Sequence, residues 1–320
     1  MVVDYNMAAT RVHGVPRILS KLQGSIRDKN FYEAHQLYRT LYFRYLGVKK
    51  YKDLLDLLYS GAILLLENDQ HTSGADVAIL YVDVLVKSET PPTDEYIVKL
   101  SRLLQMMDPD APERETYLEH ALRWSGDGGH PQLHKSLAQV FWKQKNYVRA
   151  RQHFLQSCDG RGFAVMLVEL QRQHGFTAEV DLFIAQAVLQ YLCVENKWRT
   201  AKDAFQTYTL QHPNIRAGPP YLLPLLNFLW FLLKAVESGK LNAFKVLCEQ
   251  YQPSIRRDPS YQDYLDKIGH VFFGIPLPKA HSQGFFENIL QSFLTGVPED
   301  TRPQPSTSRQ HAHMDTDALD

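Results

Sequence analysis

One spacing recurs along this chain: a large apolar side chain, an alanine three positions later and an aromatic side chain four positions after that. Each clear copy follows an asparagine or an Asn-Lys turn, and the copies are Phe31, Ala34 and Tyr38; Tyr147, Ala150 and Phe154; and Trp198, Ala201 and Phe205. Looser copies are Tyr51, Leu54 and Leu58, and Leu241, Phe244 and Cys248. Because positions i, i+3 and i+7 share one face of an α-helix, each copy predicts a helix that a neighbouring helix can approach closely.

This pattern is typical of the second helix of tetratricopeptide-type repeats, in which helix pairs stack into a solenoid. The intervals between the copies are unequal, so we expect a degenerate array rather than a strictly periodic one. No segment shows the β-branched alternation of a strand. The sequence therefore predicts an all-α fold, a tetratricopeptide-like α-solenoid built as a right-handed stack of helix pairs. Such a fold usually presents binding surfaces rather than an enclosed reaction site.

Breaks rich in Pro, Gly and Asn predict the domain organisation. We expect a flexible N-terminus over residues 1–14, a solenoid over 15–295 and a disordered tail over 296–320. The tail is dominated by Pro, Ser, Thr, His and Asp, so it has too few apolar side chains to bury. The N-terminal half of the solenoid extends to about residue 129, where a Gly-rich loop ends, and the C-terminal half begins at about 130.

The most apolar segment covers residues 221–236 and is interrupted by Pro224 and Asn227. Its longest clean run is far shorter than the ~20 residues that a membrane span needs, so we predict a buried helix there and no membrane insertion. After a further helix we predict a turn from Pro253 to Pro259. A short apolar segment then follows at 285–294.

Charge is balanced over the whole chain but not along it. The 35 basic and 35 acidic residues give a net charge of zero, which disfavours nucleic acid as a partner. Residues 1–60 contain ten basic and five acidic side chains, a net charge of +5. That end is expected to prefer an acidic partner surface.

We find no motif that carries catalysis, a cofactor or a metal. The glycines at 126–129 lack the strand and the Lys-Ser/Thr of a phosphate-binding loop, and no G-x-S-x-G occurs. His130 and His134 lack the glutamate and third ligand of a zinc helix. Acidic pairs such as Glu179 and Asp181 are interpreted as solvated or first-turn carboxylates. We therefore predict that the protein is not an enzyme.

The cysteines Cys158, Cys193 and Cys248 show no pairing framework. We interpret each as a small buried apolar residue in a reducing compartment. The first ten residues lack the apolar core of a secretory signal peptide. These features together predict a cytosolic protein.

Several strings resemble the Golgi-to-ER-traffic protein four family, a factor for guided entry of tail-anchored proteins. They are FYEAHQLYRTL at 31–41, GPP at 218–220 with PLLNF at 224–228, CEQYQPS at 248–254 and RRDP at 256–259. The resemblance extends from about Pro16 to Pro276. It implies an α-helical repeat fold without catalysis.

The resemblance also implies a function. The implied function is that of a cytosolic scaffold that takes part in the handover of tail-anchored membrane proteins to a targeting ATPase. The partners would be that ATPase, a Bag-family chaperone scaffold and a ubiquitin-like adaptor, in a complex that also routes failed clients to degradation. The family uses its N-terminal helices toward the ATPase and its C-terminal half toward the scaffold or adaptor.

The +5 charge of the N-terminal end fits this division. Our candidates for the ATPase-facing surface are Arg17, Lys21, Arg27, Arg39 and Arg44. Our candidates for the scaffold or adaptor surface are Arg256, Arg257, Tyr261 and Tyr264. For Arg256 to Pro259 an Arg–Asp cap at the start of the next helix is an alternative interpretation.

Two other classes of function fit the helical periodicity. A repeat-type chaperone that binds apolar client segments directly would need an exposed apolar groove. A helical subunit of a proteasome-lid or signalosome-like complex would normally end in a winged-helix module with strands, which no segment of this chain predicts.

Overall fold

The computed structural model describes residues 14–277, which form α-helices, one 3-10 helix and no strand. The N-terminal half contains α2 (Val15–Arg27), α3 (Phe31–Gly47), α4 (Tyr51–Glu67), α5 (His71–Lys87), α6 (Asp94–Met106) and α7 (Pro112–Trp124). The C-terminal half contains α8 (Pro131–Lys143), α9 (Tyr147–Gln156), α10 (Gly160–His174), η1 (Thr177–Glu179), α11 (Val180–Leu192), α12 (Trp198–Gln211), α13 (Pro224–Ser238), α14 (Leu241–Gln250), α15 (Gln252–Ile255) and α16 (Ser260–Phe273).

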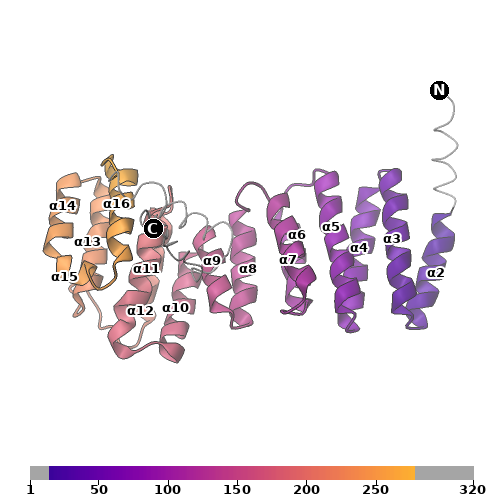
Figure 1. Cartoon of the computed structure of the whole chain (residues 1–320), viewed down its shortest axis with the longest axis horizontal. Coiled ribbons are helices and arrows are strands. Elements are labelled where there is room, and N and C mark those ends of the chain that lie inside the picture. Colours follow the sequence, from indigo (N-terminus) through magenta and orange to yellow (C-terminus); the bar gives the residue numbers. More distant parts are fainter. Residues whose placement is uncertain (1–13, 278–320) are drawn as a thin grey trace, which may run out of the picture.

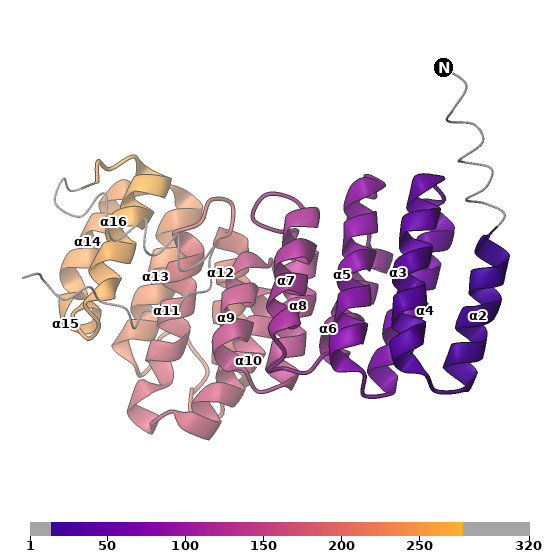
Figure 2. The ribbon, with the colours of Figure 1, turned by 45° about the vertical axis from the view of Figure 1, so that its right-hand side comes forward.

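The helices stand side by side along one axis, from α2 at one end to α14 at the other (Figure 1). Most helices pack against the next helix in sequence, and many also against the next but one, as α3 does with α5, α4 with α6 and α10 with α12. Figure 2 shows the same order from a second direction, with α14 and α15 again at the end remote from α2. This two-row stack confirms the predicted all-α solenoid.

The recurring spacing forms the packed face of its helices. Ala34, Ala150 and Ala201 are fully buried, and so are the aromatic residues that follow them four positions later. The buried side chains form one continuous hydrophobic cluster that extends from Leu22 to Ile268 and crosses the loop at 125–129. The small residue at i+3 therefore marks a position of close helix contact.

Each turn before the three copies contains one residue with positive φ, but that residue is a lysine in two turns and an asparagine in the third. In the first two copies a lysine with positive φ precedes the asparagine, whose side chain accepts the amide N–H three residues on and caps the helix. In the third copy Asn196 takes the positive φ of 62°, and Lys197 is the N-cap residue before α12 begins at Trp198. The Nζ atom of Lys197 donates to the carbonyls of Leu155, Gln156 and Ser157 at 2.7, 2.7 and 2.9 Å, which closes the end of α9.

Prolines lie in the first turns of α13 and α15 in the C-terminal half. The apolar helix α13 begins at Pro224, where proline suits a first turn, and Gly239 ends it with a φ of 63°. The predicted turn from Pro253 to Pro259 is wrong at its start, because α15 occupies Gln252–Ile255 and accommodates Pro253 in its first turn. The predicted tail, the segment 285–294 and most of the predicted flexible N-terminus lie outside the described residues.

Candidate partner-binding surfaces

The basic residues of α2 lie on the outside of the first helix of the stack. Arg17, Lys21 and Arg27 are all exposed. Lys21 Nζ lies 2.7 Å from Glu33 Oε1, and hydrogen bonds from Lys21 and Ser25 lower the pKa of that carboxyl. Arg17 and Arg27 form no ion pair with any other residue in the range 14–277. These two arginines therefore carry the charge that is most available to a partner on α2.

Arg39 and Arg44 are half-buried and belong to contacts between helices. Arg39 Nη1 lies 2.8 Å from Asp76 Oδ2 on α5, and His35 Nε2 lies 2.7 Å from the same oxygen. These two partners lower the pKa of Asp76. Arg44 lies against Gly14 at the start of α2, where a Cβ atom would overlap its guanidinium and displace it. Lys21, Arg39 and Arg44 thus each contact a different neighbour, so the predicted basic residues do not form one uniform patch.

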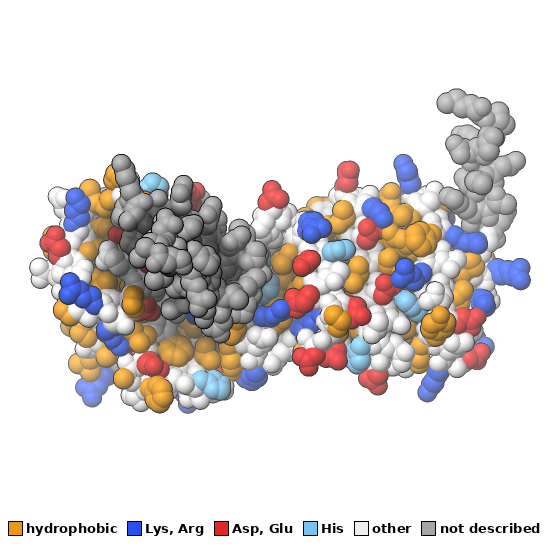
Figure 3. Space-filling model, viewed as in Figure 1, with side chains coloured by type: hydrophobic (Ala, Val, Ile, Leu, Met, Phe, Trp, Pro, Cys, Tyr) orange, Lys and Arg blue, Asp and Glu red, His pale blue; other side chains and the backbone are white. Residues whose placement is uncertain are grey.

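The seam between α3 and α5 also exposes one residue of the aromatic stripe Tyr38, Tyr42, Phe43 and Tyr45, most of which the sequence predicts to be core. Tyr42 donates to Asp83, and Lys87 Nζ lies 2.6 Å from Asp83 and 2.7 Å from the Tyr42 hydroxyl. Phe43, beside this network, is 63% exposed and contacts the Tyr42 ring edge-on with centroids 5.0 Å apart. The N-terminal half carries basic and acidic side chains side by side in Figure 3. This surface therefore carries charges of both signs, and Phe43 adds an exposed aromatic ring to it.

The expectation that Tyr261 and Tyr264 face a partner does not fit the structure. Tyr261 is 1% exposed and Tyr264 is 5% exposed, because both belong to the face of α16 that packs on α11. The Tyr264 hydroxyl accepts a hydrogen bond of 3.0 Å from Gln190 Nε2. Burial raises the pKa of both phenols. These two residues are core residues of the C-terminal half.

The two arginines beside them differ from each other. Arg256 is exposed, and its Nε atom donates to Gln252 Oε1 at 3.2 Å. Arg257 instead pairs with Asp181 on α11 and also donates to the carbonyl of Ala178 at 3.1 Å. Asp181 is fully buried, so it is not a solvated carboxylate, but it lies in the first turn of α11, as the alternative interpretation predicted.

In the alternative interpretation, an arginine and an aspartate together cap α16. The structure shows the aspartate, Asp258, at this position, but not an arginine. Asp258 Oδ1 accepts from the backbone N–H of Ser260 at 2.9 Å and from its hydroxyl at 2.7 Å, at the start of α16. Arg257 turns away toward α11. Of the four residues predicted for the C-terminal surface, Arg256 is the one that is both exposed and free of any contact to a distant helix among the described residues.

The cysteines and histidines form no reactive centre in the described part of the chain. Cys158 is exposed in the turn after α9, so its predicted burial is wrong. Cys193 and Cys248 are partly buried, and burial raises the pKa of each thiol to about 12. The ring of His134 lies between the Gly128 carbonyl and His153, each at 2.8 Å. Within residues 14–277 no three His, Cys, Asp or Glu side chains gather as metal ligands would.

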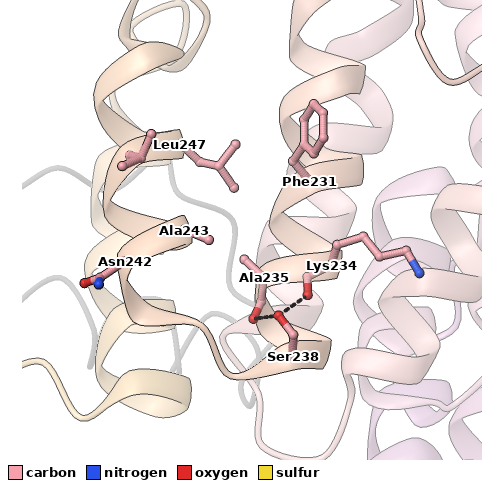
Figure 4. Close-up of a pocket in the computed structure, with 8 residues that line it drawn as sticks. Phe231, Lys234, Ala235, Ser238, Asn242, Ala243 and Leu247 are labelled. Carbon is pink, nitrogen blue, oxygen red and sulfur yellow. Dashed lines mark hydrogen bonds between the residues drawn. The ribbon is translucent and has the colours of Figure 1, made fainter.

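An apolar groove that the sequence did not indicate lies between α13 and α14. Its volume is about 460 Å³, and the residues that line it are Phe231, Lys234, Ala235, Ser238, Asn242, Ala243, Val246 and Leu247. Phe231 is 42% exposed and Val246 is 53% exposed, although both come from apolar helices. In Figure 4 Phe231 and Ala235 of α13 stand opposite Ala243 and Leu247 of α14. No sequence signal pointed to this groove, because a strongly apolar helix is expected to be buried on every side.

Among residues 14–277, no helix combines the length and the apolar character needed to cross a membrane. Most apolar side chains of α13 are buried in the core, and Phe231 and Ala235 line the groove. The described part of the molecule thus presents two surfaces of different chemistry, a charged one around α2, α3 and α5 and an apolar one between α13 and α14.

Known proteins resemble this chain over nearly its whole length. The family model "Golgi to ER traffic protein 4" matches residues 48–294. The Golgi to ER traffic protein 4 homolog of Homo sapiens is 49% identical over 300 residues, which is 92% of this chain and 91% of the human protein. The homolog of Xenopus tropicalis is 49% identical over 291 residues, 90% of this chain and 89% of that protein. The crystal structure of C. therm. Get4 matches with a TM-score of 0.75 at 26% identity and covers 92% of this chain and 99% of that one.

Proposed function

Because the chain belongs to the Golgi to ER traffic protein 4 family, we propose that it is a non-enzymatic cytosolic scaffold that acts after translation in targeting tail-anchored membrane proteins to the ER. Family membership supports a role in Golgi-to-ER traffic in general. In the proposed role the protein links a targeting ATPase to a Bag-family scaffold and its ubiquitin-like adaptor. The same complex takes part in quality control of mislocalised proteins.

The observation that supports this role is the pair of different surfaces toward opposite ends of one continuous stack. The charged surface lies on α2, α3 and α5, and the apolar groove lies between α13 and α14. Figure 1 shows α2 and α14 at the two ends of the stack. One continuous core joins them. A scaffold of this kind works through proximity, because two partners held on one body meet at a high effective concentration.

The N-terminal surface suits an acidic partner that must be released again. Arg17 and Arg27 are exposed and lack ion-pair partners within residues 14–277. Exposed charges of this kind steer association and add modest affinity, and salt screens them within ~8 Å at physiological ionic strength. The contact with the ATPase is therefore expected to form rapidly and to weaken as the salt concentration rises.

The C-terminal surface suits a partner that presents an apolar helix. An amphipathic helix places residues at i, i+3, i+4 and i+7 into such a groove. Phe231 and Val246 provide exposed apolar area on both walls. We assign this half of the protein to the Bag-family scaffold or the adaptor.

The test is a reconstitution with purified ATPase and purified Bag-family scaffold. The double variant Arg17→Glu with Arg27→Glu should lose ATPase binding and retain scaffold binding. The matched control is Arg102→Glu with Arg172→Glu, because these arginines are also exposed and the change in net charge is the same. Equal loss of ATPase binding in both double variants, or no loss in either at low salt, would refute the assignment of the N-terminal surface.

A second candidate function is direct binding of apolar client segments, and the groove is the observation that favours it. A scaffold should not bind an isolated tail-anchor peptide, whereas a client-binding chaperone should. Fluorescence anisotropy of a labelled tail-anchor peptide separates the two. Binding that Val246→Asp abolishes and Val148→Asp preserves would support the chaperone, because both valines are exposed but only Val246 lines the groove.

A further inference from the structure

The groove between α13 and α14 lies at an end of the solenoid where another helix would normally continue the stack. Repeat stacks expose apolar surface at their ends unless a capping element with a polar outer face covers it. Here the lining is almost entirely apolar, and Phe231 and Val246 remain about half exposed. The described fold therefore lacks the element that would cover this surface.

The described chain ends close to the same helix. A second groove of about 270 Å³ lies between α14 and α16, and Cys248, Leu265, Ile275 and Pro276 are among the residues that line it. Phe273 stacks on Phe244 of α14 with ring centroids 4.9 Å apart, and the N–H of Ile275 donates to the Gly269 carbonyl at 3.1 Å. The backbone therefore leaves the end of α16 next to α14. The other side of α14 forms one wall of the α13–α14 groove.

The sequence beyond that point contains a suitable covering segment. Residues 285–294 read FFENILQSFL, and Phe286, Ile289, Leu290 and Phe293 have the i, i+3, i+4 and i+7 spacing of one helix face. The polar residues Asn288 and Gln291 have positions on the opposite face. The match to the family model continues to residue 294, so this segment belongs to the family domain and not to the polar tail.

We propose that residues 285–294 seat their apolar face in the α13–α14 groove of the same chain. The nine residue-to-residue steps from Leu277 to Phe286 span roughly 30 Å when extended, and α14, with its ten residues, is only about 15 Å long. A tethered segment competes at an effective concentration in the millimolar range. An apolar partner segment that uses this groove must therefore displace residues 285–294 first.

This inference does not depend on the scaffold role, because it concerns the purified full chain without partners. Photocrosslinking tests it. Benzoylphenylalanine replaces Val246 in the groove, and in a control protein it replaces Tyr32, which is 78% exposed at the other end of the stack. After illumination and proteolysis, mass spectrometry identifies the peptide joined to the probe. We expect the Val246 probe, and not the Tyr32 probe, to join the peptide that contains 285–294 within one chain.

A pair of matched variants makes the result specific. Phe286→Asp with Phe293→Asp should lower the crosslink yield by at least about tenfold, because two large apolar side chains leave the buried face. Asn288→Asp with Gln291→Asp adds the same charge on the opposite face and should leave the yield unchanged. A probe that joins a second copy of the chain, joins no peptide from 285–294, or responds equally to both variants overturns the proposal.

Discussion

Arg257 Nη1 lies 2.5 Å from Oδ2 of Asp181, a residue 76 positions earlier in the chain. The carboxylate of Asp181 is completely buried, and the guanidinium of Arg257 is its ion-pair partner among the described residues. This pair ties the turn before α16 to the start of α11. It shows that the RRDP string at 256–259 has a structural function in the C-terminal half.

Arg257→Ala should destabilise the fold, because it leaves the buried Asp181 charge without its partner. Breaking a fully buried pair costs ~3–5 kcal/mol, and the 35% exposure of Arg257 reduces the expected loss in the free energy of unfolding to about 2–3 kcal/mol. Urea denaturation measures it. The control is the exposed neighbour in Arg256→Ala, expected within ~0.5 kcal/mol of wild type. Equal stability of the two variants would contradict a structural role for the pair.

Ala150→Leu should destabilise the C-terminal half, because a larger side chain at this fully buried position separates two packed helices. Overpacking of this kind costs about 1–3 kcal/mol. Val148→Leu on the same helix is the control, since Val148 is 64% exposed and its enlargement meets solvent. Thermal unfolding followed by circular dichroism compares them, and a normal midpoint for Ala150→Leu would contradict close packing at the recurring small residue.

The pair His134 and His153 should make the protein acid-sensitive. Burial lowers the pKa of His134 to about 4 and that of His153 to about 3, and the neighbouring Arg149 also acts on His153. Both values lie below the ordinary 6.5, so the unfolded chain binds protons first as the pH falls. The stability contributed by the neutral rings is therefore complete above pH 6.5 and declines as the pH falls toward 4.

Urea denaturation at pH 7.5 and pH 5 checks this expectation. The wild type should lose stability between these values, and His153→Gln should lose less, because one proton-binding site is removed from the unfolded chain. His120→Gln is a control on a histidine outside this pair. An unchanged pH dependence in His153→Gln would show that other groups control the acid sensitivity.

Asn146 and Asn196 stand before two copies of the same spacing but should respond differently to substitution. Asn146→Ala removes a helix cap and should cost about 1 kcal/mol. Asn196→Gly should cost little or nothing, because Asn196 has a φ of 62°, a conformation that glycine adopts without strain. Chemical denaturation of both variants measures the two losses in the free energy of unfolding. Equal losses would indicate that both asparagines cap their helices and would contradict this prediction.

The sequence alone was sufficient for the fold class and for the packed face of most helices. Spacings of three, four and seven residues are local, so they identify the face of α3, α9 or α12 that carries Ala34, Ala150 or Ala201 whatever lies beyond it. The apolar run at 221–236 likewise predicted the buried helix α13, although Pro224, which interrupts that run, is the first residue of the helix. The strings that resemble the family were also readable, and the match over residues 48–294 confirms that resemblance.

Only the tertiary structure decided which surfaces are available to partners. Tyr261 and Tyr264 looked like interface anchors, but α16 turns them onto α11. Asp181 looked solvated, but Arg257 covers it from 76 positions away. Phe231 looked buried, but it lines an open groove. The physical reason is the same in each case: a helix pattern specifies which face is apolar, whereas the path of the chain decides whether another helix covers that face.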